Sequence, residues 1–334
     1  MHIESRAPTR IDLAGGTLDI WPLYLYHQPA VTVNVAIELN AACRITPRRD
    51  HKIVLLSYDT GRREIFGSFA ELSAAKDHHL ALPALLVRAF RPPNGLVLET
   101  DSEAPVGAGL GGSSALNIAI CGALNELTRA GYSLAKRIEI ARNVEAQVIR
   151  IPTGEQDYFS ATYGGVSAIH WRPEGPLRES ISLRLEELEE RLVLVYTGEP
   201  RASAINNWQV MKAHIDGSRR VLRNFDKLAH IALEMHQALA EQDWREVGRL
   251  LHREWQVRRR NAPGISTPFI DRLWPIAHRA GAVASKVCGA GGGGCVVYFV
   301  EKGARARVEQ ALGRAGARLI PVRIARRGLR LTRG

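Results

Sequence analysis

The first third of the chain carries the hydrophobic pattern of strands. Residues 31–37 alternate apolar and polar positions with a period of two, and 52–58 are rich in residues that strands favour. A helix is expected at about 79–91 and a further strand at 95–100. A glycine-rich loop follows that strand.

Helical spacing dominates the middle of the chain. One helix is expected from about 113 to 129, and another at 133–150, where Pro152 ends it. The short apolar run 191–196 predicts a buried strand, whereas 203–260 is almost wholly helical in pattern.

The last part of the chain returns to strands. Residues 282–286 and 295–300 predict strands on either side of a glycine loop, followed by a helix (304–315) and a strand (317–324). Strands followed by helices, with short mixed connections, predict an α+β fold in two lobes. The basic stretch 325–330 is expected to be a solvated end.

The expected domain boundary lies in a segment rich in proline, glutamate and arginine, residues 171–184. It divides the chain into an N-terminal domain, 1–180, and a C-terminal domain, 181–334. Because 334 residues can bury a sizeable core, two domains are compatible with the length.

Composition excludes several classes of protein. With 46% hydrophobic and 24% charged residues, the chain resembles ordinary globular proteins. No apolar run approaches the length of a membrane span, and the N-terminus lacks the layout of a signal peptide. The four cysteines form no CxxC pair and fit neither a disulfide framework nor a zinc site. We therefore expect a cytoplasmic protein without a membrane partner.

The net charge of +11 suits an anionic partner. Nucleic acids, nucleotides and sugar phosphates are all anionic. Because no basic run is interleaved with aromatic residues, nucleic-acid binding is not expected.

The strongest chemical signal is the glycine-rich run from 105 to 115, between an expected strand and an expected helix. Its glycines allow successive N–H groups to surround a phosphate, and the helix N-terminus adds positive charge. No Gly-Lys-Ser/Thr follows, so the run is not a P-loop, and no βαβ unit surrounds it, so it is not a Rossmann fingerprint. The candidate phosphate-binding residues are Pro105, Gly107, Gly109, Leu110, Gly111, Gly112, Ser113, Ser114 and Ala115.

Two acidic residues form a second candidate group. Asp157 lies in the segment 154–158, and Glu145 lies on the preceding expected helix. One carboxylate could bind Mg²⁺ while the other meets an acceptor hydroxyl, as phosphoryl transfer requires. In the alternative interpretation, Asp157 caps a helix and Glu145 lies on a solvated face.

Two further segments carry candidate residues. Four consecutive glycines, 291–294, suggest close approach of a ligand or of another backbone, or else a flexible hairpin loop. Near the N-terminus, Arg10 could neutralise charge at a transferring group, and Asp19 could accept hydrogen bonds from sugar hydroxyls.

Taken in this order, these clusters resemble those of the GHMP kinases, a superfamily that includes galactokinase, homoserine kinase and mevalonate kinase. The details are most similar to the branch of D-glycero-D-manno-heptose 7-phosphate kinase and L-fucose kinase. The matching segments are Ala14 to Asp19 (AGGGTD-like), Gly109 to Leu116 (GLGSSSAL-like), Gly154 to Tyr158 (GKQDQY-like), Lys286 to Gly294 (K-x-x-GAGGGG) and Thr197 to Ser203 (TGxxRxAS).

The resemblance implies a fold and a set of roles. The fold would combine an N-terminal ribosomal-protein-like α/β domain with a C-terminal ferredoxin-like domain, and ATP would bind between them. Asp157 would face the acceptor hydroxyl, with Arg10 beside it. Glu145 and a loop serine would bind Mg²⁺. That serine is either Ser113 or Ser114, and the implied substrate-binding residues are Gly16, Thr17, Asp19, Gly291 and Gly292.

Departures from the family motifs bear on the substrate. The Glu-His pair of galactokinases is Gly16-Thr17 here, which argues against galactose. The Ser-Gly-x-Asp of mevalonate kinases is Gly154-Glu155-Gln156-Asp157, which disfavours mevalonate. The expected function is ATP-dependent phosphorylation of a hydroxyl on a sugar or sugar phosphate.

Alternatives to that function share the fold. They are a kinase for a non-sugar alcohol such as mevalonate, an ATP-using decarboxylase, and a non-catalytic sugar and nucleotide sensor. The oligomeric state stays open, with a homodimer among the alternatives.

Overall fold

The computed structural model describes residues 2–199 and 203–334. The segment 197–203, which matches TGxxRxAS, therefore lies partly outside the described residues. The strands are β1 (Ile3–Ala14), β2 (Ala30–Pro47), β3 (Ile53–Ser57), β4 (Arg62–Phe66), β5 (Leu96–Ser102), β6 (Val166–Arg172), β7 (Gly175–Ser180), β8 (Leu192–Tyr196), β9 (Ala282–Val287), β10 (Cys295–Val300), β11 (Arg318–Ile320) and β12 (Arg330–Arg333). The helices are α1 (Leu23–Tyr26), α2 (Phe69–Ala74), α3 (Ala81–Phe90), α4 (Gly112–Thr128), α5 (Leu134–Ile149), α6 (Gln156–Tyr163), α7 (Leu185–Glu190), α8 (Ser203–Ile215), α9 (Arg219–Glu241), α10 (Trp244–Arg258), α11 (Pro268–Ala280) and α12 (Arg305–Arg314).

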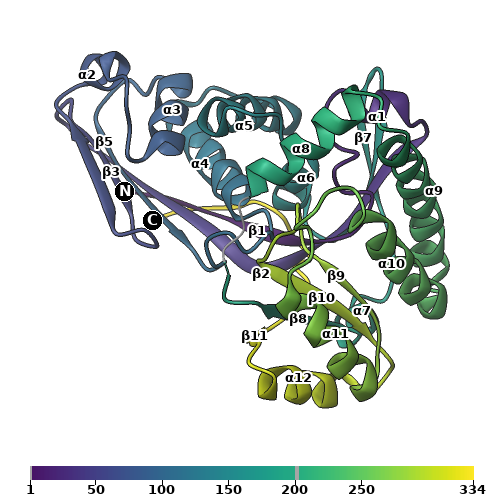
Figure 1. The fold of residues 1–334 in the computed structure, drawn as a ribbon. Coiled ribbons are helices and arrows are strands. Elements are labelled where there is room, and N and C mark those ends of the chain that lie inside the picture. The colour runs from purple at the N-terminus through teal and green to yellow at the C-terminus, as the bar shows by residue number, and fades with distance from the viewer. Residues whose placement is uncertain (1, 200–202) are drawn as a thin grey trace.

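Two sheets organise these elements (Figure 1). The larger, eight-stranded sheet has the order β12-β1-β2-β5-β3-β4, with the β6–β7 hairpin joined to β2. Helices α3, α4 and α5 lie over one face of it (Figure 1). The smaller sheet is antiparallel, in the order β11-β8-β10-β9, and packs against α10, α11 and α12. The α+β prediction is therefore confirmed.

The long strands β1 and β2 belong to both lobes. Ile3 and Ala7 of β1 lie in the core beneath α3–α6. Ile11 and Leu13, further along the same strand, lie in a second core with α9, α10 and the smaller sheet. Because one strand contributes to both cores, β1 fixes the position of one lobe relative to the other.

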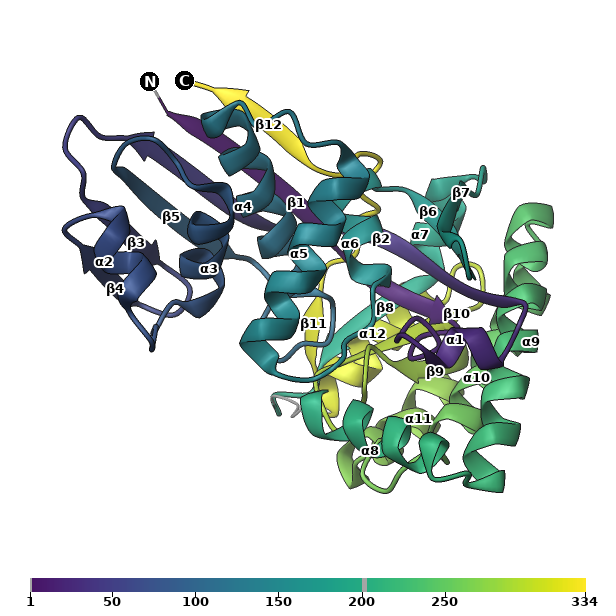
Figure 2. The same cartoon turned by 90° about the horizontal axis from the view of Figure 1, so that it is seen from above.

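Most predicted elements are confirmed. The segment 171–184, where the domain boundary is expected, contains a strand that was not predicted: β7 (Gly175–Ser180) pairs with β6 and continues the larger sheet. Two prolines, at 173 and 176, and the mostly exposed residues of β7 leave this hairpin without a clear strand pattern in the sequence. The division of domains at residue 180 stays a prediction. The C-terminal strand β12 lies in the larger sheet, beside β1 (Figure 2).

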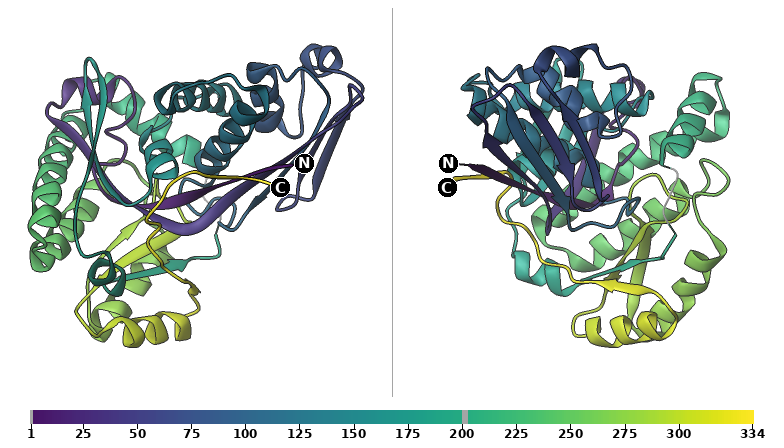
Figure 3. Two further views of the ribbon diagram at one scale, coloured as in Figure 1. Left: turned by 180° about the vertical axis from the view of Figure 1, so that it is seen from behind. Right: turned by 90° about the vertical axis from the view of Figure 1, so that its left-hand side faces the viewer.

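The basic C-terminal stretch is not a solvated end. The two ends of the chain lie side by side in two further views (Figure 3). Leu329 packs against α4, so closely that a Cβ added to Gly122 would lie 2.7 Å from its Cδ2. A Cβ on Gly328 would lie 2.2 Å from the backbone of Thr162 in α6. This stretch thus supports the helix that carries Asp157.

Substitution of Gly328 tests this contact. We expect Gly328→Ala to lower the free energy of unfolding by about 1–3 kcal/mol, because its methyl group meets rigid backbone. The control is Gly313→Ala in α12, where the nearest atom is 3.8 Å away. Alanine there should be neutral or stabilising by up to about 1 kcal/mol. Equal denaturant midpoints for the two variants would contradict the docked tail.

Candidate active site

An ion pair between Arg10 and Asp157 lies at the centre of the site. Arg10 lies on β1, and Asp157 lies in the first turn of α6, where the helix dipole favours a negative charge. The Arg10 Nε and a terminal guanidinium nitrogen each lie 2.7 Å from Asp157 Oδ1. The other guanidinium nitrogen donates to the carbonyl of Gly109 at 2.6 Å. Arg10 thereby joins the acid to the glycine-rich loop.

The glycine-rich loop has the conformation that its sequence predicts. Gly107, Gly109 and Gly111 have φ values of 71°, 80° and 75°, which side chains disfavour. Gly111 is the N-cap of α4 and has no side chain to occupy the first N–H groups of that helix. A Cβ on Gly111 would lie 2.9 Å from the carboxyl carbon of Asp157. The loop, the helix N-terminus and the acid therefore converge.

Glu145 of α5 is buried beside the same helix N-terminus. Its Oε2 accepts hydrogen bonds from the hydroxyls of Ser114, at 2.9 Å, and Tyr158, at 2.6 Å. Burial raises the pKa of Glu145, although hydrogen bonds from Tyr158, Ser113 and Ser114 oppose that shift. Ser113 is exposed and Ser114 is buried. Glu145 is therefore not on a solvated face, and both serines lie close to it.

Asp19 is a second buried carboxylate, in the turn after β1. Its Oδ2 accepts the N–H of Gln156 at 3.0 Å, and a Cβ on Gly154 would lie 2.3 Å from that oxygen. Within the described part of the chain, its buried Oδ1 has no hydrogen-bond partner. Burial raises the pKa of Asp19 to about 7. An unpartnered carboxylate oxygen here can accept a hydrogen bond from a bound hydroxyl.

A buried ionic network lies beneath the first motif. Lys286 Nζ lies 2.8 Å from Asp12 Oδ2 and 3.5 Å from Glu254 Oε1. Burial would raise the pKa of Asp12, but the charges of Lys286 and Arg258 hold it below its usual value. The network joins β1 to β9 and α10, and so joins the two lobes.

Arg258 extends this network to the turn that precedes Asp19. It donates to Glu254 at 2.8 Å, to the Gly16 carbonyl at 2.7 Å and to Thr17 Oγ1 at 3.0 Å. Thr17 has a φ of 72°, which is rare for a β-branched residue and is typical of constrained functional sites. Sequence reasoning missed Asp12, Arg258 and Glu254, because residues on a strand and a distant helix give no local sign of pairing.

The second glycine-rich segment packs against the first. Cys295 donates its N–H to the Ala108 carbonyl at 2.7 Å, and a Cβ on Gly294 would lie equally close to that oxygen. Gly292 donates to the carbonyl of Ile265 at 2.9 Å, and Gly291 packs against the same residue. The glycines of this segment therefore allow its backbone to pack closely against that of Ala108 and Ile265.

These groups surround a cleft of about 410 Å³ between the lobes. Arg10, Asp19, Glu145 and Asp157 all line it, as does the loop from 105 to 114. The second glycine segment contributes Gly289 and Ala290, whereas Gly291 and Gly292 lie against Ile265. The cleft residues that sequence reasoning missed include Asp59, Thr60, Ser102 and Asn207.

No helix among the described residues is long and apolar enough to cross a membrane.

Family models match both lobes. The model of the GHMP kinases N-terminal domain matches residues 78–165, and the GHMP kinases C-terminal model matches 235–318. The D-glycero-alpha-D-manno-heptose 7-phosphate kinase of Campylobacter jejuni is 30% identical, over 90% of this chain and 89% of that relative. The L-fucokinase/L-fucose-1-P guanylyltransferase of Bacteroides fragilis is 28% identical over 92% of this chain, which spans 35% of that protein.

The fold itself recurs among solved structures. The crystal structure of a D-glycero-D-manno-heptose 1-phosphate kinase from Bacteroides thetaiotaomicron aligns with a TM-score of 0.79 at 23% identity, covering 99% of both chains. The resemblance of the chain to the GHMP kinases, and its similarity to the heptose 7-phosphate and fucose kinase branch, are confirmed. The chain belongs to the GHMP kinases.

Proposed function

We propose that this chain transfers the γ-phosphoryl group of ATP to a hydroxyl of a sugar or sugar phosphate. The observation that carries the proposal is the Arg10–Asp157 pair, which places a carboxylate against the glycine-rich loop inside a cleft large enough for a small molecule. ATP is the phosphate donor that membership of a kinase family implies. A sugar acceptor is supported by the heptose-phosphate kinase and fucokinase relatives, over the mevalonate alternative.

Asp157 has the central role in the proposed reaction. It aligns the acceptor hydroxyl and takes its proton as the new P–O bond forms. Arg10 orients the carboxylate through two contacts of 2.7 Å. A nearly buried guanidinium also places positive charge beside the transferring group.

The glycine-rich loop is proposed to hold the nucleotide phosphates through its N–H groups and the N-terminus of α4. Glu145, with the hydroxyl of Ser113 or Ser114, is the proposed Mg²⁺ site. This donor set consists of oxygen atoms, which Mg²⁺ prefers, and a single carboxylate leaves positions for phosphate oxygens and water. When bound, the ion neutralises charge on the phosphates.

The acceptor is proposed to lie between Asp157 and Asp19. The unpartnered Oδ1 of Asp19 would accept a hydrogen bond from it, beside Gly16 and Thr17. Gly289 and Ala290 take the place of Gly291 and Gly292 in this proposal, because they are the members of their loop that line the cleft.

Removing the charge of Asp157 tests the proposal directly. The substrate is first selected by measuring ADP release with a panel of sugars and sugar phosphates that also includes mevalonate. With the selected sugar or sugar phosphate, Asp157→Asn should lower kcat by about 10² to 10⁴. The affinity for ATP should change little. Glu145→Gln should instead weaken the use of Mg²⁺·ATP and be partly rescued by excess Mg²⁺.

Asp59→Asn is the matched control, since Asp59 also lines the cleft but lies on the turn after β3. It should retain kcat within a few-fold. Melting temperatures of the same preparations separate lost chemistry from lost folding. A near-wild-type kcat for Asp157→Asn, or ADP release with mevalonate alone, would contradict the proposal.

The ionisation of Asp19 predicts a pH dependence. The pKa of Asp19 is about 7, so its carboxylate becomes a full acceptor only as the pH rises through that value. The kcat/KM for the acceptor should therefore rise between about pH 6 and 8. Asp19→Asn should lower this ratio by about 10- to 100-fold, the value of a charged hydrogen bond, and should flatten this limb of the profile. An unchanged profile in the variant would assign the titration to another group.

A further inference from the structure

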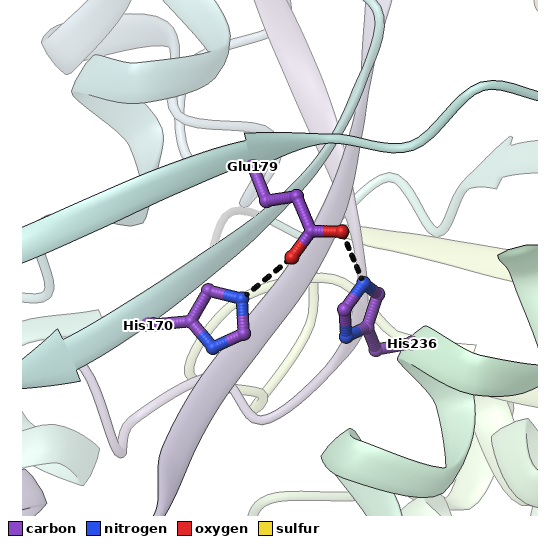
Figure 4. Close-up of side chains that lie close together, drawn as sticks. All are labelled: His170, Glu179 and His236. Atoms are coloured by element: carbon purple, nitrogen blue, oxygen red, sulfur yellow. Dashed lines mark hydrogen bonds and ion pairs between the residues drawn. The ribbon is translucent and has the colours of Figure 1, made fainter.

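Three potential metal ligands meet on a part of the surface away from the cleft: His170 of β6, Glu179 of β7 and His236 of α9 (Figure 4). Their ligand atoms all lie within 4.8 Å of one another. No member of this group lines the active-site cleft. The proposed kinase reaction leaves the group unexplained.

Local structure brings the first two side chains together. In the antiparallel hairpin, Glu179 is paired with Ala168, and His170 lies two residues further along the same strand. Side chains two residues apart on a strand share a face, so His170 and Glu179 are diagonal neighbours. The third side chain comes from α9, which packs across β2 and β1 of the same sheet.

The contacts converge on one carboxylate. His170 Nε2 lies 3.0 Å from Glu179 Oε2, and His236 Nε2 lies 3.1 Å from Oε1. The two imidazole rings are 5.5 Å apart in an edge-to-face arrangement.

The spacing suits a tetrahedral transition-metal ion. Zinc takes histidine nitrogens and carboxylate oxygens at about 2.0–2.2 Å, so neighbouring ligand atoms in a tetrahedron lie about 3.3–3.6 Å apart. The two histidine–carboxylate distances, 3.0 and 3.1 Å, are somewhat shorter than that spacing, and each histidine contacts a different oxygen of Glu179. A small shift of the side chains would therefore admit an ion between them. The Glu179 side chain is 51% exposed and the histidines are about one-fifth exposed, so water can supply the fourth ligand.

We propose that His170, Glu179 and His236 form a binding site for Zn²⁺ or a similar divalent transition metal. The ion would replace the two hydrogen bonds with metal–ligand bonds and would tie the β6–β7 hairpin of the larger sheet to α9. It would thereby stabilise the packing of α9 on the larger sheet without entering the reaction. The cysteine pattern could not predict this site, because its ligands are two histidines and a glutamate.

The test is a calorimetric titration of the full chain with Zn²⁺ alone, in buffer containing millimolar Mg²⁺ to occupy the proposed catalytic metal site. We expect one ion per chain to bind with a micromolar or lower Kd and to raise the melting temperature by several degrees. His170→Gln, His236→Gln and Glu179→Gln should each weaken that binding at least tenfold and abolish the thermal shift. With Co²⁺ as the probe, the wild type should show the intense visible bands of a tetrahedral site.

The matched control is His230→Gln. His230 is an exposed histidine on the same helix, 3.2 Å from Glu234, and lies outside the proposed site. It should bind Zn²⁺ as the wild type does. The three site variants should retain kinase activity with Mg²⁺, which separates this proposal from the proposed function. Wild-type protein that binds no Zn²⁺, or a His170→Gln/His236→Gln double variant that binds it equally well, would overturn the proposal. The three residues would then form only a hydrogen-bonded contact between α9 and the β6–β7 hairpin.

Discussion

The arrangement of the site depends on the buried guanidinium of Arg10. A charge removed from water is costly unless it is paired, and breaking a buried pair by removing one partner typically costs about 3–5 kcal/mol. Here the partners are Asp157 of α6 and the carbonyl of Gly109 in the glycine-rich loop. Because the Arg10 guanidinium contacts both partners, it fixes the position of Asp157 relative to the phosphate-binding loop.

The same strand carries a second buried charge that joins the lobes. Asp12 follows Arg10 by two residues and so lies on the same face of β1. It pairs with Lys286 of β9, and Arg258 continues the network to Gly16 and Thr17. One face of one strand thus orients the acid through Arg10 and supports the acceptor side of the cleft through Asp12. This explains how a cleft between two lobes can keep its geometry.

Sequence patterns predicted the parts of the site that lie within continuous motifs. The glycine-rich loop and its helix were predictable because glycine spacing and the following apolar period are local features. The meeting of Glu145 with Ser114 across two helices was implied by family resemblance and is present at 2.9 Å. Asp12, Arg258 and the histidine cluster could not be predicted, because nothing in a single sequence pairs a strand with a distant helix. The packing of Leu329 against the core was not predicted either, because Leu329 is a single apolar residue in a stretch rich in arginine.

A double-mutant cycle in kcat shows whether Arg10 acts through Asp157. Arg10→Lys keeps the charge but cannot make both contacts with Asp157 and the bond to Gly109. If Arg10 works by orienting the carboxylate, adding Arg10→Lys to Asp157→Asn should lower kcat only a few-fold further, because residues that act as a unit are not additive. Losses that multiply in the double variant would show that the two residues act independently and would contradict this account.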